Sequence, residues 1–301
     1  MRCTYVKRPS ADSPISYIDQ TAVAHAISLD PGASLKPWME LGLEGLALVG
    51  AGAYILWLVS LARRDASIVD RFWGLGFVVL AAWYASHGGG WPIRSSVLLA
   101  LTTAWGIRLS LHIHWRNRGK PEDPRYARWR KEGGASYWRT SLFKVFLLQA
   151  LIMWIVSAPL LAGQSSETPA HLTPTDFVGG TIWLIGFAFE AVGDAQLAAF
   201  RRSPANTGKV LSTGLWRYTR HPNYFGDALI WWGFFVIAVS VPGGVWTVFS
   251  PVLMTVLLAR VSGVALLEAG LRETRPGYAD YVARTSAFVP WPPKSRGPDS
   301  G

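Results

Sequence analysis

Long apolar runs, separated by polar and basic stretches, dominate the pattern of side chains along the chain. A helix that crosses the hydrocarbon core of a bilayer needs roughly 20 mostly apolar residues. Seven runs approach that length, so we predict an all-α integral membrane protein with seven transmembrane helices, six or eight being the alternatives. The predicted spans are Leu43–Ala62, Ile68–Ser86, Pro92–Ile113, Ser141–Ala162, Phe177–Phe200, Ala228–Val241 and Val245–Val261.

Composition supports a membrane protein over a soluble one. Half of the 301 residues are hydrophobic and 16% are charged, whereas soluble domains carry about 25% charged residues. The chain also has 16 tryptophans, a residue that gathers at membrane interfaces.

The basic residues separate onto alternate loops. The stretches 63–71, 114–140, 201–224 and the chain from 263 onward hold 21 Lys and Arg, and the stretches on the other side hold 5. The positive-inside rule places the basic side in the cytoplasm, so the N-terminus is predicted outside and the C-terminus inside. The net charge of +10 then follows from topology, and no nucleic-acid partner is expected. The membrane would be the inner membrane of a bacterium or the endoplasmic reticulum of a eukaryote.

The ends of the chain differ from its body. Residues 1–39 lack the apolar core of a signal peptide and are predicted to be a flexible tail. Residues 40–293 form the membrane domain, and 294–301 are expected to be a disordered tail.

Two carboxylates and a cation lie on one face of the fifth span. Glu190, Asp194 and Arg201 are spaced so that they fall within about 40° of one another on a helix. Ionisable groups inside a span are costly and usually functional. A ligand site is therefore favoured over a structural polar cluster.

The third span has a similar face, made of Trp105, Arg108, His112 and Trp115. Arg108 could extend to the interface or bind an anion. His112 and His114 point to different sides and make a poor metal pair, so no metal is assigned. At the start of the second span, Asp70 is either an interfacial anchor or part of a site.

The stretch "GLWRYTRHPNYFGD" concentrates cations and aromatic residues beside an apolar run. Gly214 permits a tight turn, and Pro222 predicts a new helix start. The N–H groups at that start, with Arg220 and His221, favour an anion such as phosphate. Asn223 and Asp227 follow on the membrane side.

A last basic stretch, Leu271–Trp291, carries Tyr278, Tyr281 and Arg284. It predicts an amphipathic helix on the membrane surface or a lid. Together these features indicate a cytoplasm-facing pocket for a polyanion that opens into a lipid-lined cavity.

The motifs "GFAFEAVGDAQLAAFRR", "LSTGLWRYTRHPNYFGDALIWWG" and "PGYADYVARTSAFVPWPP" resemble the DUF1295 group of the steroid 5-alpha-reductase superfamily, over roughly Ala62–Pro293. The resemblance implies a seven-span bundle and an NADPH-dependent reductase with the cofactor in a cytoplasm-facing cavity. It assigns cofactor binding to Arg108, Arg118, Glu190, Asp194, Arg201, Tyr218, Asn223 and Asp227. Arg220, Tyr281 and Arg284, which lie in the two basic stretches described above, are expected to bind the cofactor as well.

The resemblance is weaker in the half that recognises the substrate. The steroid enzymes carry a Gln-Glu pair on the second span, where this chain has Asp70 and Arg71, and a Tyr on the third span, where it has Trp105 or Gly106. The expected activity is an oxidoreductase acting on a CH–CH group with NADP as acceptor. Its substrate would be a lipid-like C=C compound, whether steroid, isoprenoid or fatty-acyl.

The chemistry implied is hydride transfer to a polarised C=C, with a donor for the developing oxyanion and a proton for the neighbouring carbon. The candidates for donor or acid are Asp70, His221 and Tyr224. The motif "RHPNYFG" is also similar to one in S-adenosylmethionine-dependent isoprenylcysteine methyltransferases, which follow it with a Glu-Glu pair where this chain has Leu267-Glu268. That activity and a non-catalytic membrane protein are the alternatives.

Overall fold

The computed structural model describes residues 36–261, 268 and 275–294, and the named elements in that part of the chain are all helical. An isolated parallel bridge joins Thr219 and Ser286. The predicted all-helical class is confirmed. The longer helices are α2 (Lys36–Arg63), α3 (Ile68–His87), α4 (Pro92–Asn117), α5 (Pro124–Gly133), α7 (Leu148–Val156), α8 (Ala158–Ser165), α9 (Pro174–Arg202), α10 (Pro222–Ala238), α11 (Phe249–Val256) and α13 (Tyr278–Arg284).

Five helical segments in the described residues are long and apolar enough to cross a membrane, two fewer than the sequence predicted. They are Trp38–Arg63, Ile68–His87, Pro92–Asn117, Pro124–Val156 and Pro174–Arg202. The sixth and seventh predicted spans are helical but short. α10 has 17 residues, about 26 Å at 1.5 Å per residue against a core of about 30 Å. The apolar stretch Gly244–Arg260 begins as a 3-10 turn and is also below the length of a span.

Proline and capping residues explain where several helices begin. Pro92, Pro174 and Pro222 each occupy the first turn of a helix, where the missing N–H has no intrahelical partner in any case. α9 also has a capping box between Thr173 and Asp176, which satisfies two free backbone donors. The restart predicted at Pro222 and the turn at Gly214, with φ of +61°, are both confirmed.

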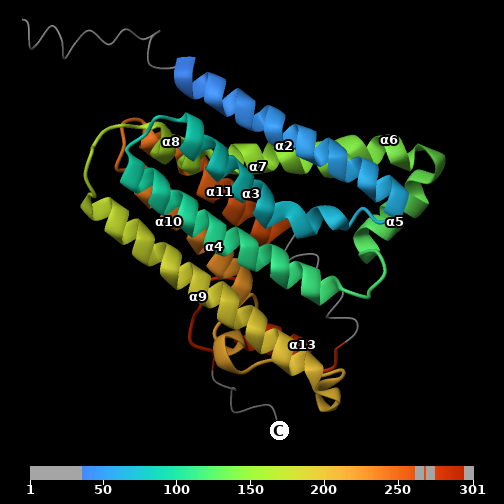
Figure 1. Cartoon of the computed structure of the whole chain (residues 1–301). Helices are drawn as coiled ribbons and strands as arrows, with labels where there is room; N and C mark the ends of the chain where they lie inside the picture. The colour runs from blue at the N-terminus through green and yellow to red at the C-terminus, as the bar shows by residue number, and fades with distance from the viewer. Residues whose placement is uncertain (1–35, 262–267, 269–274, 295–301) are drawn as a thin grey trace, which may run out of the picture. The chain divides into compact units, whose positions relative to one another are not determined.

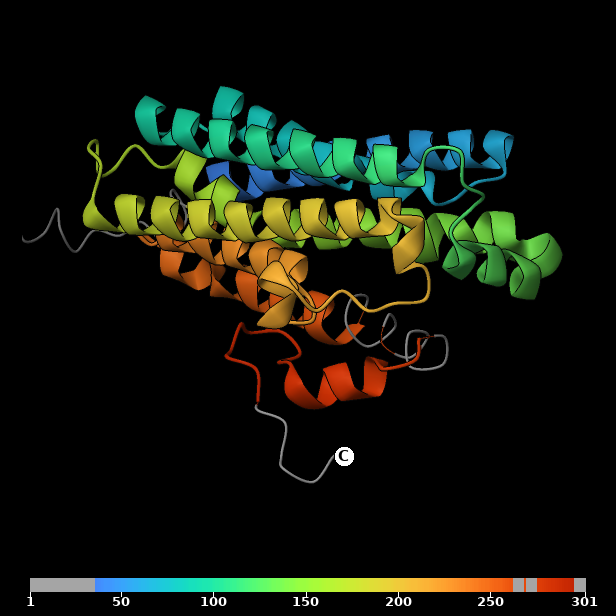
Figure 2. The ribbon, with the colours of Figure 1, turned by 90° about the horizontal axis from the view of Figure 1, so that it is seen from below.

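The helices pack as close pairs. α3 lies along α4, and α9 lies along α10. Figure 1 shows α4 and α9 running side by side across the front of the view, and in Figure 2 the α3–α4 pair lies on one side of α9 while α10 lies on the other. Aromatic rings fill the interior between the pairs: Phe77 of α3, Trp105 of α4 and Trp231 of α10 lie with centroids 4.5–5.6 Å apart.

Glycines bring α9 and α10 together. Gly179 and Gly186 on α9 face Gly233 and Gly226 on α10, seven residues apart on each helix. A Cβ on Gly186 would lie 2.7 Å from the Gly226 carbonyl oxygen and 2.8 Å from the Ile230 nitrogen. Such distances leave no room for a side chain, so backbone contact fixes the register of the two helices.

Replacing Gly186 by Ala should therefore push the two helices apart. We expect a loss of about 1–3 kcal/mol in the free energy of unfolding, as for other overpacked interiors. Gly180 is the matched control, because a Cβ there meets nothing within 4 Å and Gly180→Ala should stabilise the helix by up to about 1 kcal/mol. Thermal unfolding of both variants in detergent checks this; equal melting temperatures would contradict the close packing.

A buried ion pair joins the first turns of α4 and α9. The Arg94 side chain is fully buried, and its Nε and Nη2 donate to the two Asp176 carboxylate oxygens over 2.9 and 3.1 Å. Its remaining donors reach the carbonyls of Pro169 and His171 at 3.0 and 2.8 Å. The loop between α8 and α9 is thus tied to both helices.

The predicted tails, residues 1–39 and 294–301, lie almost entirely outside the described residues. At the N-terminal side helix α2 begins at Lys36, and at the C-terminal side the last described residue is Lys294. The stretch Leu271–Trp291 is described from residue 275 onward. It forms the short helix α13, whose Tyr278 and Tyr281 side chains are buried.

Candidate functional site

The site is built beside a close contact between α9 and α10, where a Cβ on Gly226 would lie 2.5 Å from the Glu190 nitrogen. Glu190 and Asp194 lie one turn apart on α9, and Asn223 and Asp227 lie one turn apart on α10. The Asn223 Nδ2 donates to Asp194 Oδ1 over 3.1 Å. Glu190 and Asp194 therefore share one face of α9, as their spacing predicted. α10 adds an amide, Asn223, and a third carboxylate, Asp227.

Arg108 reaches this group from α4. Its Nη1 lies 2.7 Å from Glu190 Oε1. Its Nη2 donates to the Glu190 backbone carbonyl over 3.2 Å and pairs with Asp194 Oδ2. We call Arg108, Glu190, Asp194, Asn223 and Asp227 the polar cluster.

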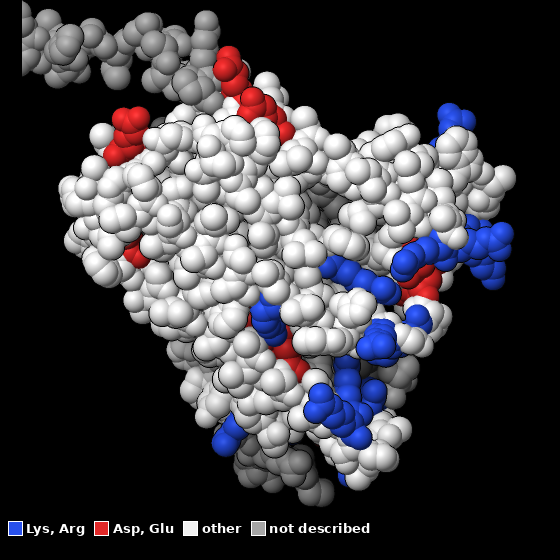
Figure 3. Space-filling view, viewed as in Figure 1, with Lys and Arg blue, Asp and Glu red and all other residues white. Residues whose placement is uncertain are grey.

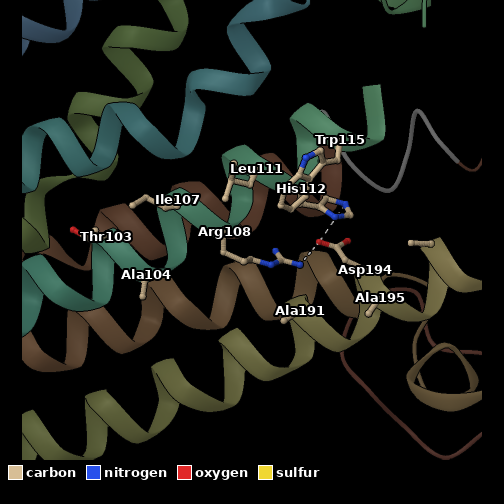
Figure 4. A pocket seen from close by; sticks show the side chains of 11 residues that line it. Thr103, Ala104, Ile107, Arg108, Leu111, His112, Trp115, Ala191, Asp194 and Ala195 are labelled. Carbon is tan, nitrogen blue, oxygen red and sulfur yellow. Dashed lines mark hydrogen bonds and ion pairs between the residues drawn. The ribbon is translucent and has the colours of Figure 1, made fainter. Parts of the chain in front are cut away.

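Two further side chains of α4 point at the cluster, as the shared helix face predicted. Trp105 donates its Nε1 to Glu190 Oε2 over 3.0 Å. The His112 Nε2 lies 3.5 Å from Asp194 Oδ2. Figure 4 shows Arg108 and His112 both extending from α4 toward Asp194 on α9.

The cluster has more acceptors than donors. Its three carboxylates are almost fully buried and meet one guanidinium. Asn223 Oδ1 has no hydrogen-bond partner among the described residues, and the Trp231 indole N–H is a donor within reach of the Asp227 carboxylate. Buried polar atoms are normally satisfied, so this group suits a ligand that brings N–H or O–H donors. No group of His, Cys, Asp and Glu in the described part of the chain could hold a metal ion.

A cavity of about 520 Å³ borders the cluster between α4 and α9. We call it the α4–α9 slot (Figure 4). It is lined by Thr103, Ala104, Ile107, Arg108, Leu111, His112, Trp115, Ala191, Asp194, Ala195 and Ala198.

Basic side chains gather beyond one end of the slot. Arg116 and Arg201, at the ends of α4 and α9, are exposed and close enough for their charges to repel. No carboxylate pairs with either one among the described residues. Figure 3 shows basic side chains concentrated toward that end of the molecule, while the rest of this face is mostly uncharged. Arg118, at the end of α4, is exposed as well.

Asp70 lies in a different group. Its Oδ1 accepts from the Tyr126 hydroxyl over 2.7 Å and its Oδ2 accepts from Arg125 over 3.1 Å. Tyr126 in turn accepts from Gln149 Nε2 over 3.3 Å. Gln149 is the polar residue in the lining of a second cavity, of about 290 Å³, between α2, α3 and α7. Asp70 therefore lies beside an apolar cavity rather than in the polar cluster.

Arg220 and His221 are enclosed by the C-terminal segment. Arg220 makes a two-pronged ion pair with Glu268, at 2.7 and 3.1 Å, and donates its Nη1 to the Thr285 carbonyl over 2.6 Å. The His221 Nε2 lies 3.2 Å from Glu268 Oε1. We call this group the C-terminal latch. It occupies all three guanidinium nitrogens of Arg220, which the sequence had assigned to a cofactor.

The remaining predicted residues surround these groups. Tyr281 donates its hydroxyl to the Trp216 carbonyl over 2.5 Å and so holds α13 on the loop before α10. Tyr218 is exposed, and Arg284 donates to a carbonyl of its own helix. Tyr224 stacks on His221 with a ring separation of 5.5 Å and lies within electrostatic reach of Asp194 and Asp227. Of the three predicted catalytic residues, Tyr224 is thus the one placed beside the polar cluster.

The chain matches the family described as "Protein of unknown function (DUF1295)" over residues 56–285, more than half of its length. It belongs to the DUF1295 family. Within curated proteins it is 26% identical to an uncharacterized protein of Schizosaccharomyces pombe, over 68% of this chain and 67% of that protein. The DUF1295 match covers the polar cluster, the slot and the C-terminal latch.

Two more distant relatives have a stated activity. The chain is 33% identical to the bovine 3-oxo-5-alpha-steroid 4-dehydrogenase 1 over 78 residues, or 26% of this chain and 30% of that enzyme. The rat enzyme of the same name is 33% identical over 29% of this chain and 32% of its own length. The chain thus aligns with about a third of these enzymes, which supports the predicted steroid-reductase-like grouping of this DUF1295 member. No solved structure matches the chain.

Several residues of these sites escaped the sequence analysis. The sequence predicts His112 on the same helix face as Arg108 but gives it no role in the site. Glu268 was noted for its place after the methyltransferase-like motif, not as a partner of Arg220. Tyr126 and Gln149 carry no local signal, because their partners are at least 23 residues away.

The C-terminal latch should weaken in mild acid. Burial lowers the pKa of the His221 imidazole below its ordinary 6.5, although Glu268 acts in the opposite sense. Burial raises the pKa of Glu268, but Arg220 and then His221 outweigh it, so this pKa also lies below its usual value. Both groups therefore stabilise the fold at neutral pH. His221 loses its contribution as pH falls below about 6.5, and Glu268 loses its contribution at lower pH.

We expect the melting temperature to fall between pH 7 and pH 5, and to fall less in His221→Gln. His114→Gln is the matched control, because His114 is exposed on α4 and should leave the slope unchanged. Melting curves at half-unit pH steps test this. Identical slopes in wild type and His221→Gln would show that the latch does not sense protons.

Proposed function

We propose that this protein is a membrane-embedded, NADPH-dependent reductase that transfers hydride to a C=C bond of a lipid-like substrate. The polar cluster carries the proposal: three carboxylates, an amide and one arginine buried between the two long apolar helices α4 and α9 and the shorter apolar helix α10. Ionisable groups in such a place are costly and mark function by default. The alignment with 3-oxo-5-alpha-steroid 4-dehydrogenases supplies the reaction class.

The cluster suits the nicotinamide half of the cofactor. A carboxamide NH₂ and ribose hydroxyls bring donors for Asn223 Oδ1, which has no partner among the described residues, and for the surplus carboxylate oxygens of the cluster. Arg116 and Arg201 beyond the cluster suit phosphates, because two unpaired guanidiniums close together favour a polyanion between them.

Two apolar cavities support a lipid-like substrate. Both the α4–α9 slot and the cavity between α2, α3 and α7 are lined mainly by apolar side chains, with several polar groups in the slot and Gln149 in the second cavity. That combination is typical of sites for small apolar ligands.

The reaction would use the residues as follows. The polar cluster, with Arg116 and Arg201, would hold NADPH, and the bound cofactor would supply the hydride for the electron-poor carbon of the C=C. The neighbouring carbon then takes a proton, for which Tyr224 is the best-placed of the predicted acids. His221 and Asp70 are bonded to Glu268 and to Arg125 and Tyr126 instead. The apolar helices exclude water, which protects the hydride.

We also propose seven crossings with the N-terminus outside and the C-terminus in the cytoplasm. The distribution of basic residues supports this orientation. α10 lies along α9. If the apolar residues 239–241 that follow α10 are counted with it, α10 can cross the membrane beside α9. The basic ends of α4 and α9 would then face the cytoplasm, where NADPH is found.

The decisive experiment is cofactor binding to the purified full chain in detergent. NADPH at about 100 times its Kd should stabilise the fold by about 2.7 kcal/mol, seen as a rise of several degrees in melting temperature. NADH is the matched comparison, because it lacks only the 2′-phosphate and should stabilise less. A rise with S-adenosylmethionine and none with NADPH would overturn the proposal in favour of a methyltransferase.

A further inference from the structure

The end of α2 meets α6 (Tyr137–Ser141) at one corner of the molecule (Figure 1). Trp57 of α2 donates its Nε1 to the Trp138 carbonyl of α6 over 2.9 Å, and the two indole rings stack with centroids 6.3 Å apart. The turn that follows α2 is held nearby, because the Ala66 nitrogen donates to Glu122 Oε1, just before α5, over 2.7 Å. The end of α2 therefore shares one region of the surface with the starts of α5 and α6.

The elements that meet there carry five exposed cations, and no carboxylate pairs with any of them among the described residues. They are Arg63, Arg64, Lys131, Arg139 and Lys144. The neighbouring acid Glu122 is paired with Arg130 over 2.8 Å instead. Figure 3 shows basic side chains gathered on the side of the molecule where Figure 1 places α5 and α6. We call the surface made of these five cations with Leu58, Trp138 and Phe143 the α2–α6 corner.

Large apolar side chains are exposed beside the cations. Leu58, Trp138 and Phe143 are 46%, 52% and 65% exposed. The Arg139 guanidinium carbon lies 5.9 Å from the centroid of the Trp138 ring. Phe143 stands on a π-helical turn, Leu142–Leu147, a form that is frequent at functional sites. The corner thus offers positive charge and apolar surface side by side.

One of the cations is kept in a strained backbone conformation. Arg64 has a φ of +53°, and it alone among the described non-glycine residues has a positive φ. It follows α2 directly, and the Asp65 nitrogen donates to the Ser60 carbonyl over 3.1 Å, as in a Schellman cap. Glycine is usual at this position because a side chain is strained there. The Arg64 side chain makes no hydrogen bond or ion pair with another described residue, so no contact in the described part of the chain offsets the strain.

The charges and the strain together indicate a partner outside the protein. α2 and the segment Pro124–Val156 are long and apolar enough to cross a membrane, so the corner at their ends lies at a bilayer surface. The positive-inside rule accounts for cations at this end, but not for an arginine where glycine is favoured. A soluble polyanion would use the cations and leave the apolar side chains in water. A phospholipid with an anionic head group matches both kinds of side chain.

We infer that the α2–α6 corner binds an anionic phospholipid. The cations of the corner, Arg64 among them, hold its phosphate, and its chains lie along Leu58 and Phe143. The inference goes beyond the proposed reductase function and does not depend on it, because the corner shares no residue with the polar cluster, the α4–α9 slot, Arg116 or Arg201. A negative result at the corner would leave the prediction of NADPH binding standing.

Lipid binding to the purified full chain tests the corner. Native mass spectrometry compares dioleoyl phosphatidylglycerol with dioleoyl phosphatidylcholine, which has the same chains and no net charge. We expect the wild type to bind phosphatidylglycerol more tightly. Arg64→Gly and Arg139→Gln should each lower that affinity about fivefold, the value of one basic residue near an anionic surface. Binding of phosphatidylcholine should stay unchanged.

Arg64→Gly has two expected effects of opposite sign. Glycine adopts a φ of +53° without strain, so the melting temperature in neutral detergent should rise by a few degrees while the affinity for phosphatidylglycerol falls. Arg63→Gln is the matched control, because Arg63 is the last residue of α2 and has the same charge without the positive φ. It should lower the affinity to a similar extent and leave the melting temperature unchanged. A stabilised Arg64→Gly variant with wild-type lipid binding would overturn the inference.

Two further measurements identify the place and the partner. Arg217→Gln removes an exposed cation on the loop before α10, outside the corner, and should keep the wild-type affinity. A loss equal to that of Arg64→Gly would mean diffuse attraction and no site at the corner. Glycerol 3-phosphate, a phosphate head group without chains, should not displace phosphatidylglycerol at constant ionic strength. Displacement would overturn the lipid assignment in favour of a soluble phosphate compound.

Discussion

In an Asp194→Asn variant we expect the rise in melting temperature caused by NADPH to disappear. Asp194 is held from three sides, by Arg108, His112 and Asn223. It therefore aligns the two helices on which the nicotinamide half of the cofactor would rest. Removing its charge frees Arg108 to turn entirely to Glu190 and loosens Asn223.

The variant should still fold. Asn has nearly the same volume as Asp, and the cluster keeps two carboxylates, Glu190 and Asp227, opposite Arg108. The melting temperature without cofactor is therefore expected to stay close to that of the wild type. Asp280→Asn, at an exposed position on α13, is the matched control and should keep the full response. An unchanged NADPH response in Asp194→Asn would remove the cluster from the cofactor site.

The Arg94→Met substitution should have the largest effect on stability itself. Arg94 is completely buried, and Met would leave the Asp176 carboxylate without its cation and the carbonyls of Pro169 and His171 without their donors. Breaking a buried ion pair from one side costs about 3–5 kcal/mol. We expect a large fall in melting temperature.

A double variant separates charge from packing. Arg94→Met with Asp176→Leu removes both charges, and such replacements often recover much of the lost stability. Recovery should be partial here, because Asp176 also caps α9 through Thr173. Arg63→Met, at an exposed position near the end of α2, should change nothing. A small effect of Arg94→Met would mean that water reaches Asp176.

The sequence predicted local structure well and distant partners poorly. The start of α3 at Ile68, of α4 at Pro92 and of α10 at Pro222 could be read from proline, polarity and run length. The shared face of Trp105, Arg108 and His112 followed from helix periodicity. These are properties of a single helix, which one stretch of sequence determines.

Two kinds of feature could not be read in that way. The partners of Arg94 and Arg220 lie 82 and 48 residues along the chain, so nothing near either residue shows that it is neutralised. The second kind of feature is where a helix ends. The predicted sixth span, Ala228–Val241, runs past the end of α10 at Ala238. The chain turns there, before Pro242 and the left-handed Gly243.

The glycine contacts between α9 and α10 restrict insertions and deletions in this part of α9. Gly186 fixes where α9 touches α10, and Glu190 and Asp194 follow it by four and eight residues. One inserted or deleted residue between them would rotate both carboxylates by about 100° around the helix, away from Arg108. Seven residues would restore the direction but shift the acids by about 10 Å. The segment from Gly186 to Asp194 can therefore accept substitutions at its outer positions, but no insertion or deletion of any size.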